Sequence, residues 1–164
     1  MTEVRLNVNP ADEQVPLQRK HWLSVLAKAS TDAIESACMP LGDLPQVQWL
    51  RQPETGLVMV RGRIGGTGAI FNLGEAPVTR CALRLQSASV GNIGVAWVQG
   101  RDVRHAELAA RLDAMLQEPQ YHKQLRTHVI NPLAALQAAR RDHLARKAAA
   151  TKVEFYTLAR GEDK

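Results

Sequence analysis

The sequence is poor in cysteine and aromatic residues, and it contains no long apolar run. Cys38 and Cys81 are its only cysteines and form no CxxC pair, so we expect no iron–sulfur or zinc site in this chain. No apolar run approaches the ~20 residues that a membrane-spanning helix needs. Residues 1–16 lack the apolar core of a signal peptide. We therefore predict a soluble, cytoplasmic protein with free thiols, no bound metal and no cofactor of its own.

The composition is that of an ordinary globular domain. The chain has 164 residues, of which 45% are hydrophobic and 23% charged, and its net charge is +5. This length favours one domain, which we place at residues 16–164, with residues 1–15 as a flexible N-terminus and residues 151–164 as a docking arm. The positive charge permits an anionic partner but does not identify one.

Both ends of the sequence show helical patterns. Pro16 is expected to open a first helix, and a second helix starts near Asp32 and ends before Pro40, where the proline ring blocks a further turn. Asp102 can cap a later helix, whose apolar residues recur at helical spacing: Leu108, Leu112, Met115 and Leu116. A short helix follows Pro119, and Asn131-Pro132 predicts a cap and first residue for a helix reaching about Ala150.

The middle of the chain alternates as strands do. The connections between these strands are short, which favours an antiparallel meander because a parallel pair needs a long crossover. We predict an α+β fold in which an antiparallel sheet of about three to five strands packs with N-terminal and C-terminal helices. The expected strands are residues 47–51, 57–64, 77–85, 95–99 and a C-terminal strand at 153–158, with turns at 52–56 and 91–94.

The segment RGRIGGTGAIFNLGEAPVTRC, residues 61–81, is the first candidate site. Its loop Gly65-Gly66-Thr67-Gly68 lacks the lysine of a Walker A motif and does not open a helix. Two readings remain open. The loop is either a nest of backbone amides for an anion or a tight connection that needs positive φ.

Arginines flank this loop and form the second candidate. Arg61 and Arg63 share one strand face, and Arg80 and Arg84 share another. In a suitable register all four guanidinium groups could line one surface, which would suit a phosphorylated substrate or an acidic partner. A solvated sheet face is an equally good interpretation.

The third candidate lies at the strand-to-helix junction formed by Arg101, Arg104 and His105. A helix N-terminus attracts anions, so the two arginines and the first amides could hold a phosphate. His105 shares the apolar side of its helix, which favours a packed or interface histidine over a catalytic one. The predicted substrate-binding set is therefore Arg61, Arg63, Gly65, Gly66, Thr67, Gly68, Arg80, Arg101, Arg104 and His105.

The C-terminal helix is basic and carries an apolar stripe. Leu133, Leu136 and Leu144 form that stripe with Arg140 near its middle, which suggests a contact with another subunit or a snorkelling side chain. No aromatic residue interleaves with the basic residues, so nucleic-acid binding is not expected. We identify no catalytic residue, because no nucleophile has an evident base and no carboxylate pair has a diagnostic spacing.

Three strings resemble the G subunit of the bacterial carbon–phosphorus lyase system, the PhnG family. They are PETGLVMVRGRIGGTGAIFNLGEAPVTRCALRL (residues 53–85), GVAWVQGRDVRHAELAARLDAML (94–116) and KVEFYTLARGED (152–163). The resemblance implies a core complex with H, I and J subunits. Together with the L protein, the G, H and I subunits form α-D-ribose 1-alkylphosphonate 5-triphosphate from ATP and an alkylphosphonate, with loss of adenine.

The resemblance also implies how the work is divided in the complex. In that family the nucleosidase activity is attributed to I, and the iron–sulfur radical chemistry to J. No catalytic residue is assigned to G. We therefore expect an accessory subunit whose most direct contact is I, with ATP and Mg as substrates of the complex. A homodimer, and direct phosphate or phosphonate binding through the glycine-rich loop and its arginines, are the alternatives.

Overall fold

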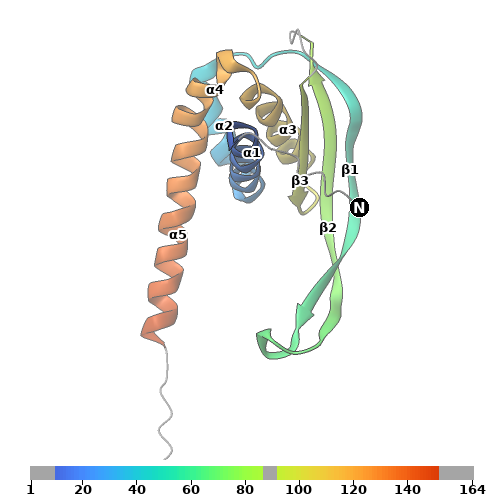
Figure 1. Cartoon of the computed structure of the whole chain (residues 1–164), viewed down its shortest axis with the longest axis vertical. Coiled ribbons are helices and arrows are strands. Elements are labelled where there is room, and N and C mark those ends of the chain that lie inside the picture. Colours follow the sequence, from blue (N-terminus) through green and yellow to red (C-terminus); the bar gives the residue numbers. More distant parts are fainter. Residues whose placement is uncertain (1–9, 87–91, 152–164) are drawn as a thin grey trace, which may run out of the picture.

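The computed structural model describes residues 10–86 and 92–151, with side chains described from residue 16 on, and consists of one sheet with helices against one of its faces (Figure 1). Its three strands pair antiparallel in the order β1-β2-β3, which confirms the predicted meander and the α+β class. The elements in chain order are α1 (Pro10–Lys28), α2 (Thr31–Cys38), β1 (Val47–Arg63), β2 (Ile70–Leu85), β3 (Ile93–Gln99), α3 (Val103–Leu116), α4 (Pro119–Leu125) and α5 (Asn131–Ala150). The predicted strand at 153–158 lies outside the described residues.

β1 is one long edge strand, so the predicted turn at 52–56 is wrong. The register with β2 shifts between Trp49 and Arg51 and again between Arg51 and Glu54. The second shift spans Pro53, which cannot donate a hydrogen bond to a ladder and is accepted in sheets at bulges and edges. The signal that suggests a turn therefore marks a bulge. The predicted turn at 91–94 is also wrong at Gly94, which lies within β3.

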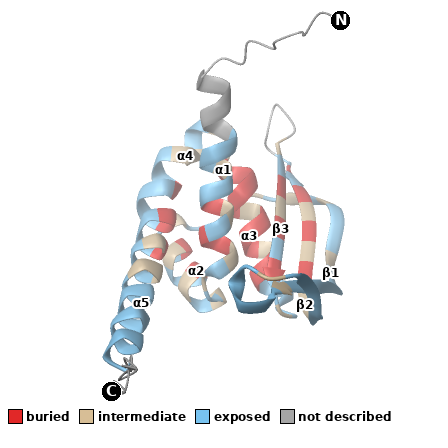
Figure 2. Ribbon diagram, turned by 60° about the horizontal axis from the view of Figure 1, so that its bottom comes forward, coloured by how far each residue is buried: buried red, intermediate tan, exposed pale blue. Residues whose placement is uncertain are grey.

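The core lies between the inner face of the sheet and α3 (Figure 2). On β2, alternate residues from Thr79 to Leu85 are buried, as the strand pattern predicts. The predicted stripe of α3 meets them: Leu108, Leu112, Met115 and Leu116 are all buried. Gly94 allows β3 to approach this helix closely, because a Cβ atom there would lie 2.0 Å from the backbone oxygen of Ala110.

The helix starts differ in detail from the predictions. α1 begins at Pro10, so the expected start at Pro16 is wrong, and residues 10–15 belong to a helix. Both prolines carry the signal of a first helical position, and the helix begins at the earlier one. α2 is capped by Ser30, whose hydroxyl accepts a hydrogen bond from the Ala33 amide, and it ends at Cys38, as Pro40 predicts.

The last third of the chain stays helical through a π turn. The turn Arg126–Ile130 joins α4 directly to α5, so Asn131 adopts helical angles and caps nothing. A π turn widens the helix just before Pro132, where the proline ring crowds an earlier carbonyl group. Of the predicted stripe only Leu133 is buried, while Leu136 and Leu144 are exposed because α5 projects from the body (Figure 1).

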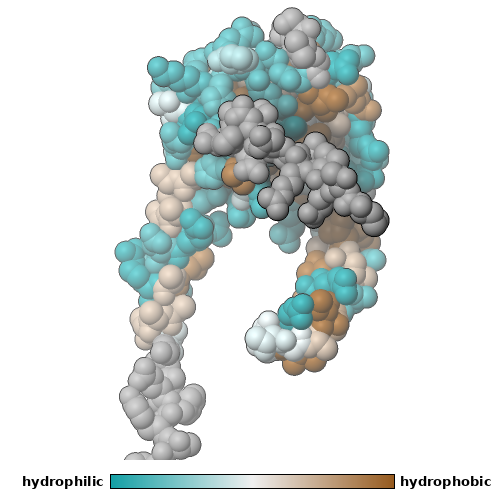
Figure 3. All heavy atoms as spheres, viewed as in Figure 1, coloured by the Kyte–Doolittle hydropathy of each residue, from teal (hydrophilic) through white to brown (hydrophobic). Residues whose placement is uncertain are grey.

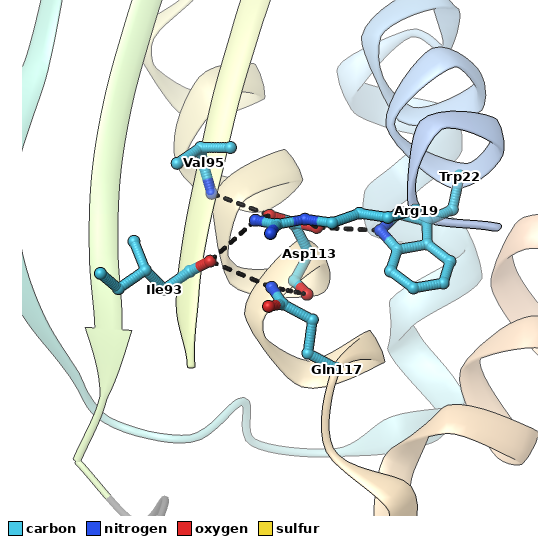
Figure 4. A network of polar contacts seen from close by, with 6 residues as sticks. All are labelled: Arg19, Trp22, Ile93, Val95, Asp113 and Gln117. Carbon is cyan, nitrogen blue, oxygen red and sulfur yellow. Dashed lines mark hydrogen bonds and ion pairs between the residues drawn. The ribbon is translucent and has the colours of Figure 1, made fainter. Parts of the chain in front are cut away.

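A buried carboxylate joins three elements of the body (Figure 4). Asp113 of α3 has no exposed surface. It accepts hydrogen bonds from Arg19 of α1 at 2.8 and 3.2 Å, from the Trp22 indole at 2.9 Å and from the Val95 amide of β3 at 2.9 Å. Arg19 also donates to the Ile93 carbonyl at 2.9 Å. One side chain therefore fixes how α1, α3 and β3 pack.

Gly94→Ala is expected to lower the free energy of unfolding by about 3 kcal/mol, because the added methyl group meets helix backbone that cannot yield locally. Gly56→Ala is the matched control: nothing lies within 4 Å of its new Cβ atom, and it should change stability by less than about 1 kcal/mol. Urea denaturation of both variants measures the difference. Equal losses would contradict the close approach at Gly94.

Asp113→Ala is expected to lower the free energy of unfolding by about 3–5 kcal/mol, because it leaves buried donors without their acceptor. Arg19→Met should cost a similar amount, because it leaves the buried Asp113 carboxylate without its counter-ion although the Trp22 and Val95 bonds remain. The double variant should lose less than the sum of the two single losses. Chemical denaturation of the four proteins gives this coupling, and strictly additive losses would show that the two side chains act independently.

Candidate functional site

The candidate site is a two-stranded arm that extends beyond the body of the protein. β3 pairs with β2 only between Val78 and Arg84, whereas β1 and β2 continue past that point. We call residues 57–77 the ribbon arm. It projects from one side of the body, and α5 projects from the other, with an open space between them (Figures 1 and 3). A two-stranded ribbon has little stability by itself, so a partner would stabilise this arm.

The outer face of the arm is apolar. Val58 and Val60 of β1 share this face with Phe71 and Leu73 of β2, since paired residues point the same way and a register shift brings Leu73 against Gly62. These four side chains are between 37% and 60% exposed. An exposed, continuous apolar patch of this kind marks an interaction surface rather than an ordinary solvent face.

The opposite face of the arm is mixed. Leu57, Met59, Arg61 and Arg63 alternate with the outer residues, as the strand pattern predicts, and Met59 faces Glu75 across the ribbon. Arg61 and Arg63 are exposed. The two faces of one ribbon therefore differ in character, and the outer one is the better candidate for burial.

The glycine loop forms the tip of the arm and is a hairpin turn. Gly65 and Gly66 have φ values of 57° and 81°, which favour glycine. The Gly68 amide donates to the Ile64 carbonyl at 2.8 Å, and Arg63 donates to the Gly68 carbonyl at 3.2 Å. These contacts match the tight-connection reading. Whether Gly65, Gly66, Thr67 and Gly68 also contact a substrate stays a prediction.

The predicted arginines do not gather on one surface. Arg61 and Arg63 lie on one face of the ribbon, whereas Arg80 and Arg84 lie on the outer face of the sheet. Glu54 pairs with Arg80 across the sheet, and Arg61 lies seven residues farther along β1. At ~3.3 Å per residue, this separation along the strand is about 23 Å. The two pairs of arginines lie on opposite faces and are far apart along the strands, so the predicted single surface of four guanidinium groups is wrong.

The helix junction residues have structural partners within the chain. Arg104 binds Glu35 at 2.9 Å and Glu107 at 3.3 Å, and the Glu35 contact raises the pKa of this guanidinium. His105 is buried, as predicted, with its Nε2 atom 2.8 Å from the Leu26 carbonyl oxygen. Arg101, just before the Asp102 cap of α3, is exposed. The substrate-binding role of all three stays a prediction.

The start of α3 already holds a carboxylate. Asp102 caps this helix by accepting a hydrogen bond from the His105 amide at 2.9 Å, as predicted. The Thr31 hydroxyl also donates to it, and these two bonds lower the pKa of Asp102, that from Thr31 the most. A phosphate at this helix terminus would meet a like charge, so the geometry does not favour an anion there.

The described side chains offer no metal site, and the two thiols are buried. Residues 10–86 and 92–151 contain no cluster of three or more histidine, cysteine or acidic residues that could hold a metal ion. Cys38 and Cys81 are buried free thiols, and burial raises the pKa of Cys81 to about 11. None of the described helices is both long and apolar enough to cross a membrane.

Fold and surface together define a class of protein: a small α+β domain with a ribbon and a helix that project from its body and that no other described part of the chain covers. The chain belongs to the family of the phosphonate metabolism protein PhnG, whose model matches residues 17–161. It is 40% identical to alpha-D-ribose 1-methylphosphonate 5-triphosphate synthase subunit PhnG of Rhizobium meliloti (strain 1021) over 153 residues, which cover 93% of this chain and 96% of the relative. That relative is, by name, a subunit of a larger synthase.

Sequence reasoning missed the residues that make the outer face distinctive. Phe71 and Leu73 fall in a segment that had no predicted strand, although their spacing of two is a strand signal. Trp97 was placed on a strand, but its exposure of 56% depends on which face the helices cover. Asp113 stands at helical spacing from the buried Ala106 and Ala109, and that spacing could have shown a buried carboxylate.

The Cys81 thiol predicts a pH dependence of stability. Between its ordinary pKa near 9 and its folded value of about 11, the unfolded chain loses the thiol proton while the folded chain keeps it. The free energy of unfolding should therefore fall as the pH rises through this window, by at most about 1.4 kcal/mol per pH unit. Denaturation at pH 8, 9, 10 and 11 measures it, with Cys81→Ala as the control. A slope unchanged in that variant would assign the effect to other groups.

Proposed function

We propose that this chain is a non-catalytic, accessory subunit of a ribose phosphonate triphosphate synthase. In this role it supports formation of α-D-ribose 1-alkylphosphonate 5-triphosphate from ATP and an alkylphosphonate in the cytoplasm. The observation that carries the proposal is the apolar outer face of the ribbon arm, which no described part of this chain covers. The family and the name of the relative support the identity of the complex.

The ribbon arm can supply much of the binding energy of such a complex. Full burial of one valine, leucine or phenylalanine side chain contributes about 1.5–3 kcal/mol. Phe71 and Leu73 are 42% and 60% exposed, and Val58 and Val60 add to the same patch. Because the patch is continuous and stands away from the body, it can be enclosed by a groove on another subunit. By the family resemblance, the I subunit is the direct contact, and H and J complete the core.

The helix α5 offers a second contact region. Its distal part, residues 139–150, is exposed and carries Arg140, Arg141, Arg146 and Lys147 near the exposed Leu144. Leu133, near the start of this helix, packs in the core, and Gln137 donates to the Val25 carbonyl at 2.8 Å, which fixes the helix to the body. The start of α5 is fixed to the body and its distal end is exposed and basic, an arrangement that suits a helix lying across another subunit.

A second candidate function is direct contact with substrate phosphate at the tip of the arm. Arg61 and Arg63 are exposed on one face next to the glycine turn, and no acidic side chain among the described residues pairs with them. Guanidinium groups in this setting can bind phosphate. Calorimetry of the assembled complex with ATP and Mg distinguishes this function. Loss of ATP affinity in Arg61→Ala/Arg63→Ala, with assembly intact, would favour it.

Leu73→Lys is expected to prevent stable assembly, because it places a charge in the centre of the outer apolar face. Asn72→Lys is the matched control, since it adds the same charge at the neighbouring exposed position on the opposite face. Co-expression with the remaining synthase subunits, followed by purification through a tag on one of them, measures recovery of each variant. Circular dichroism confirms that each chain folds. Wild-type recovery of Leu73→Lys would refute the role of this face.

A further inference from the structure

A groove lies on the outer face of the sheet, where the ribbon arm leaves the body. It encloses about 360 Å³ and is bordered by Glu54, Val58, Val78, Arg80 and Trp97. Its floor is formed where Gly56, on β1, lies opposite Val78, since a glycine leaves no side chain between these walls. The lining is apolar at Val58, Val78 and Trp97 and polar at Glu54 and Arg80, and the volume has room for one large apolar side chain together with part of its neighbours.

The walls of this groove are held in place by ionic and aromatic contacts. The Arg80 guanidinium lies over the Trp97 ring, 5.2 Å from its centroid. Arg80 also donates to Glu54 at 2.8 Å, and Arg51 donates to the same carboxylate at 2.8 Å. Tryptophan and arginine are enriched at the energetic centres of protein interfaces. Trp97 is 56% exposed although its neighbours along β3, Ala96 and Val98, are buried.

The charges around the groove specify the chemistry of its partner. Arg51, Arg80 and Arg84 lie on the outer face, with Glu54 as the acidic residue among them. The hydrogen bond from Arg80 lowers the pKa of Glu54, and this carboxylate offsets one of the three arginine charges. The surface stays positive in sum, and it is complementary to an acidic segment.

We propose that this groove receives one apolar side chain of a partner subunit, flanked on that subunit by carboxylates that pair with Arg51 and Arg84. The proposal rests on the proposed function and adds to it a defined receptor site and the chemistry of its ligand. An acidic protein segment fits better than a nucleic-acid base, because Arg80 already covers a face of the Trp97 ring on which a base would stack.

Gly56→Val tests the groove without disturbing the free chain. A Cβ atom at residue 56 meets nothing within 4 Å, and valine is favoured in strands, so the variant should fold with unchanged or greater thermal stability. Its methyl groups fill the groove, and we expect about 30-fold weaker association with the remaining synthase subunits. Gln48→Val is the matched control: it adds a valine on the same strand and the same outer face, opposite Arg84 and away from the groove.

Two further variants keep the test decisive. Trp97→Ala removes a wall of the groove at a half-exposed position, and it should weaken association by a similar factor even if Gly56→Val folds poorly. Arg84→Glu reverses a charge on the same outer face, beyond the residues that border the groove, and the variant should lose most of the salt dependence of association. Wild-type association of both Gly56→Val and Trp97→Ala would overturn the groove as a receptor.

The outcomes separate this proposal from the proposed function. Loss of assembly in Leu73→Lys with full assembly in Gly56→Val would overturn the groove alone, whereas wild-type assembly of both variants would also overturn the role of the outer face. Light scattering of the isolated chain provides a further check. A dimer that Gly56→Val converts to a monomer would identify the occupant as a second copy and overturn the partner-subunit assignment. Binding of a single-stranded oligonucleotide that Gly56→Val abolishes would also overturn it.

Discussion

The structure depends on one buried carboxylate. Asp113 has no contact with solvent, and its charge is compensated by Arg19 of α1, by the Trp22 indole and by a backbone amide of β3. A carboxylate can be buried only when such donors surround it. The three elements that supply them therefore have one arrangement in which the charge is satisfied. Apolar contacts alone would tolerate small shifts between α1 and the sheet.

This arrangement places the helical core on one face of the sheet and leaves the other face open. Thr79, Cys81 and Leu83 point inward to the core, while Arg80 and Ala82 alternate with them toward the outside. The same alternation continues into the ribbon arm, where no described helix covers either face. The exposed ribbon arm is thus a direct consequence of a sheet that is longer than the helices that cover it.

Much of the body follows from local sequence patterns. The Asp102 cap, the stripe from Leu108 to Leu116 and the alternation from Thr79 to Leu85 all appear as predicted, because each is governed by periodicity within a single element. The errors share another cause. Pro53 marks a bulge instead of a turn, and Asn131 lies within a continuous helix instead of capping one. Proline and asparagine signal a break, but neighbouring elements decide whether the chain reverses or continues.

The candidate site was less accessible to sequence reasoning. Glycines of the tip and the faces of Arg61 and Arg63 were placed correctly, because turn chemistry and strand alternation are local. The register between β1 and β2, which separates Arg61 from Arg80, depends on how the two strands pair and on where their bulges fall, and the periodicity of a single strand does not show this. By itself, then, the sequence determined the family, the α+β class and which residues share a face of each element. Only the tertiary structure decided which face of the sheet the helices cover. The position of the helices depends on the hydrogen bonds that α1 and β3 donate to Asp113. The uncovered face of the sheet is the one that exposes Trp97 and the apolar side of the ribbon arm.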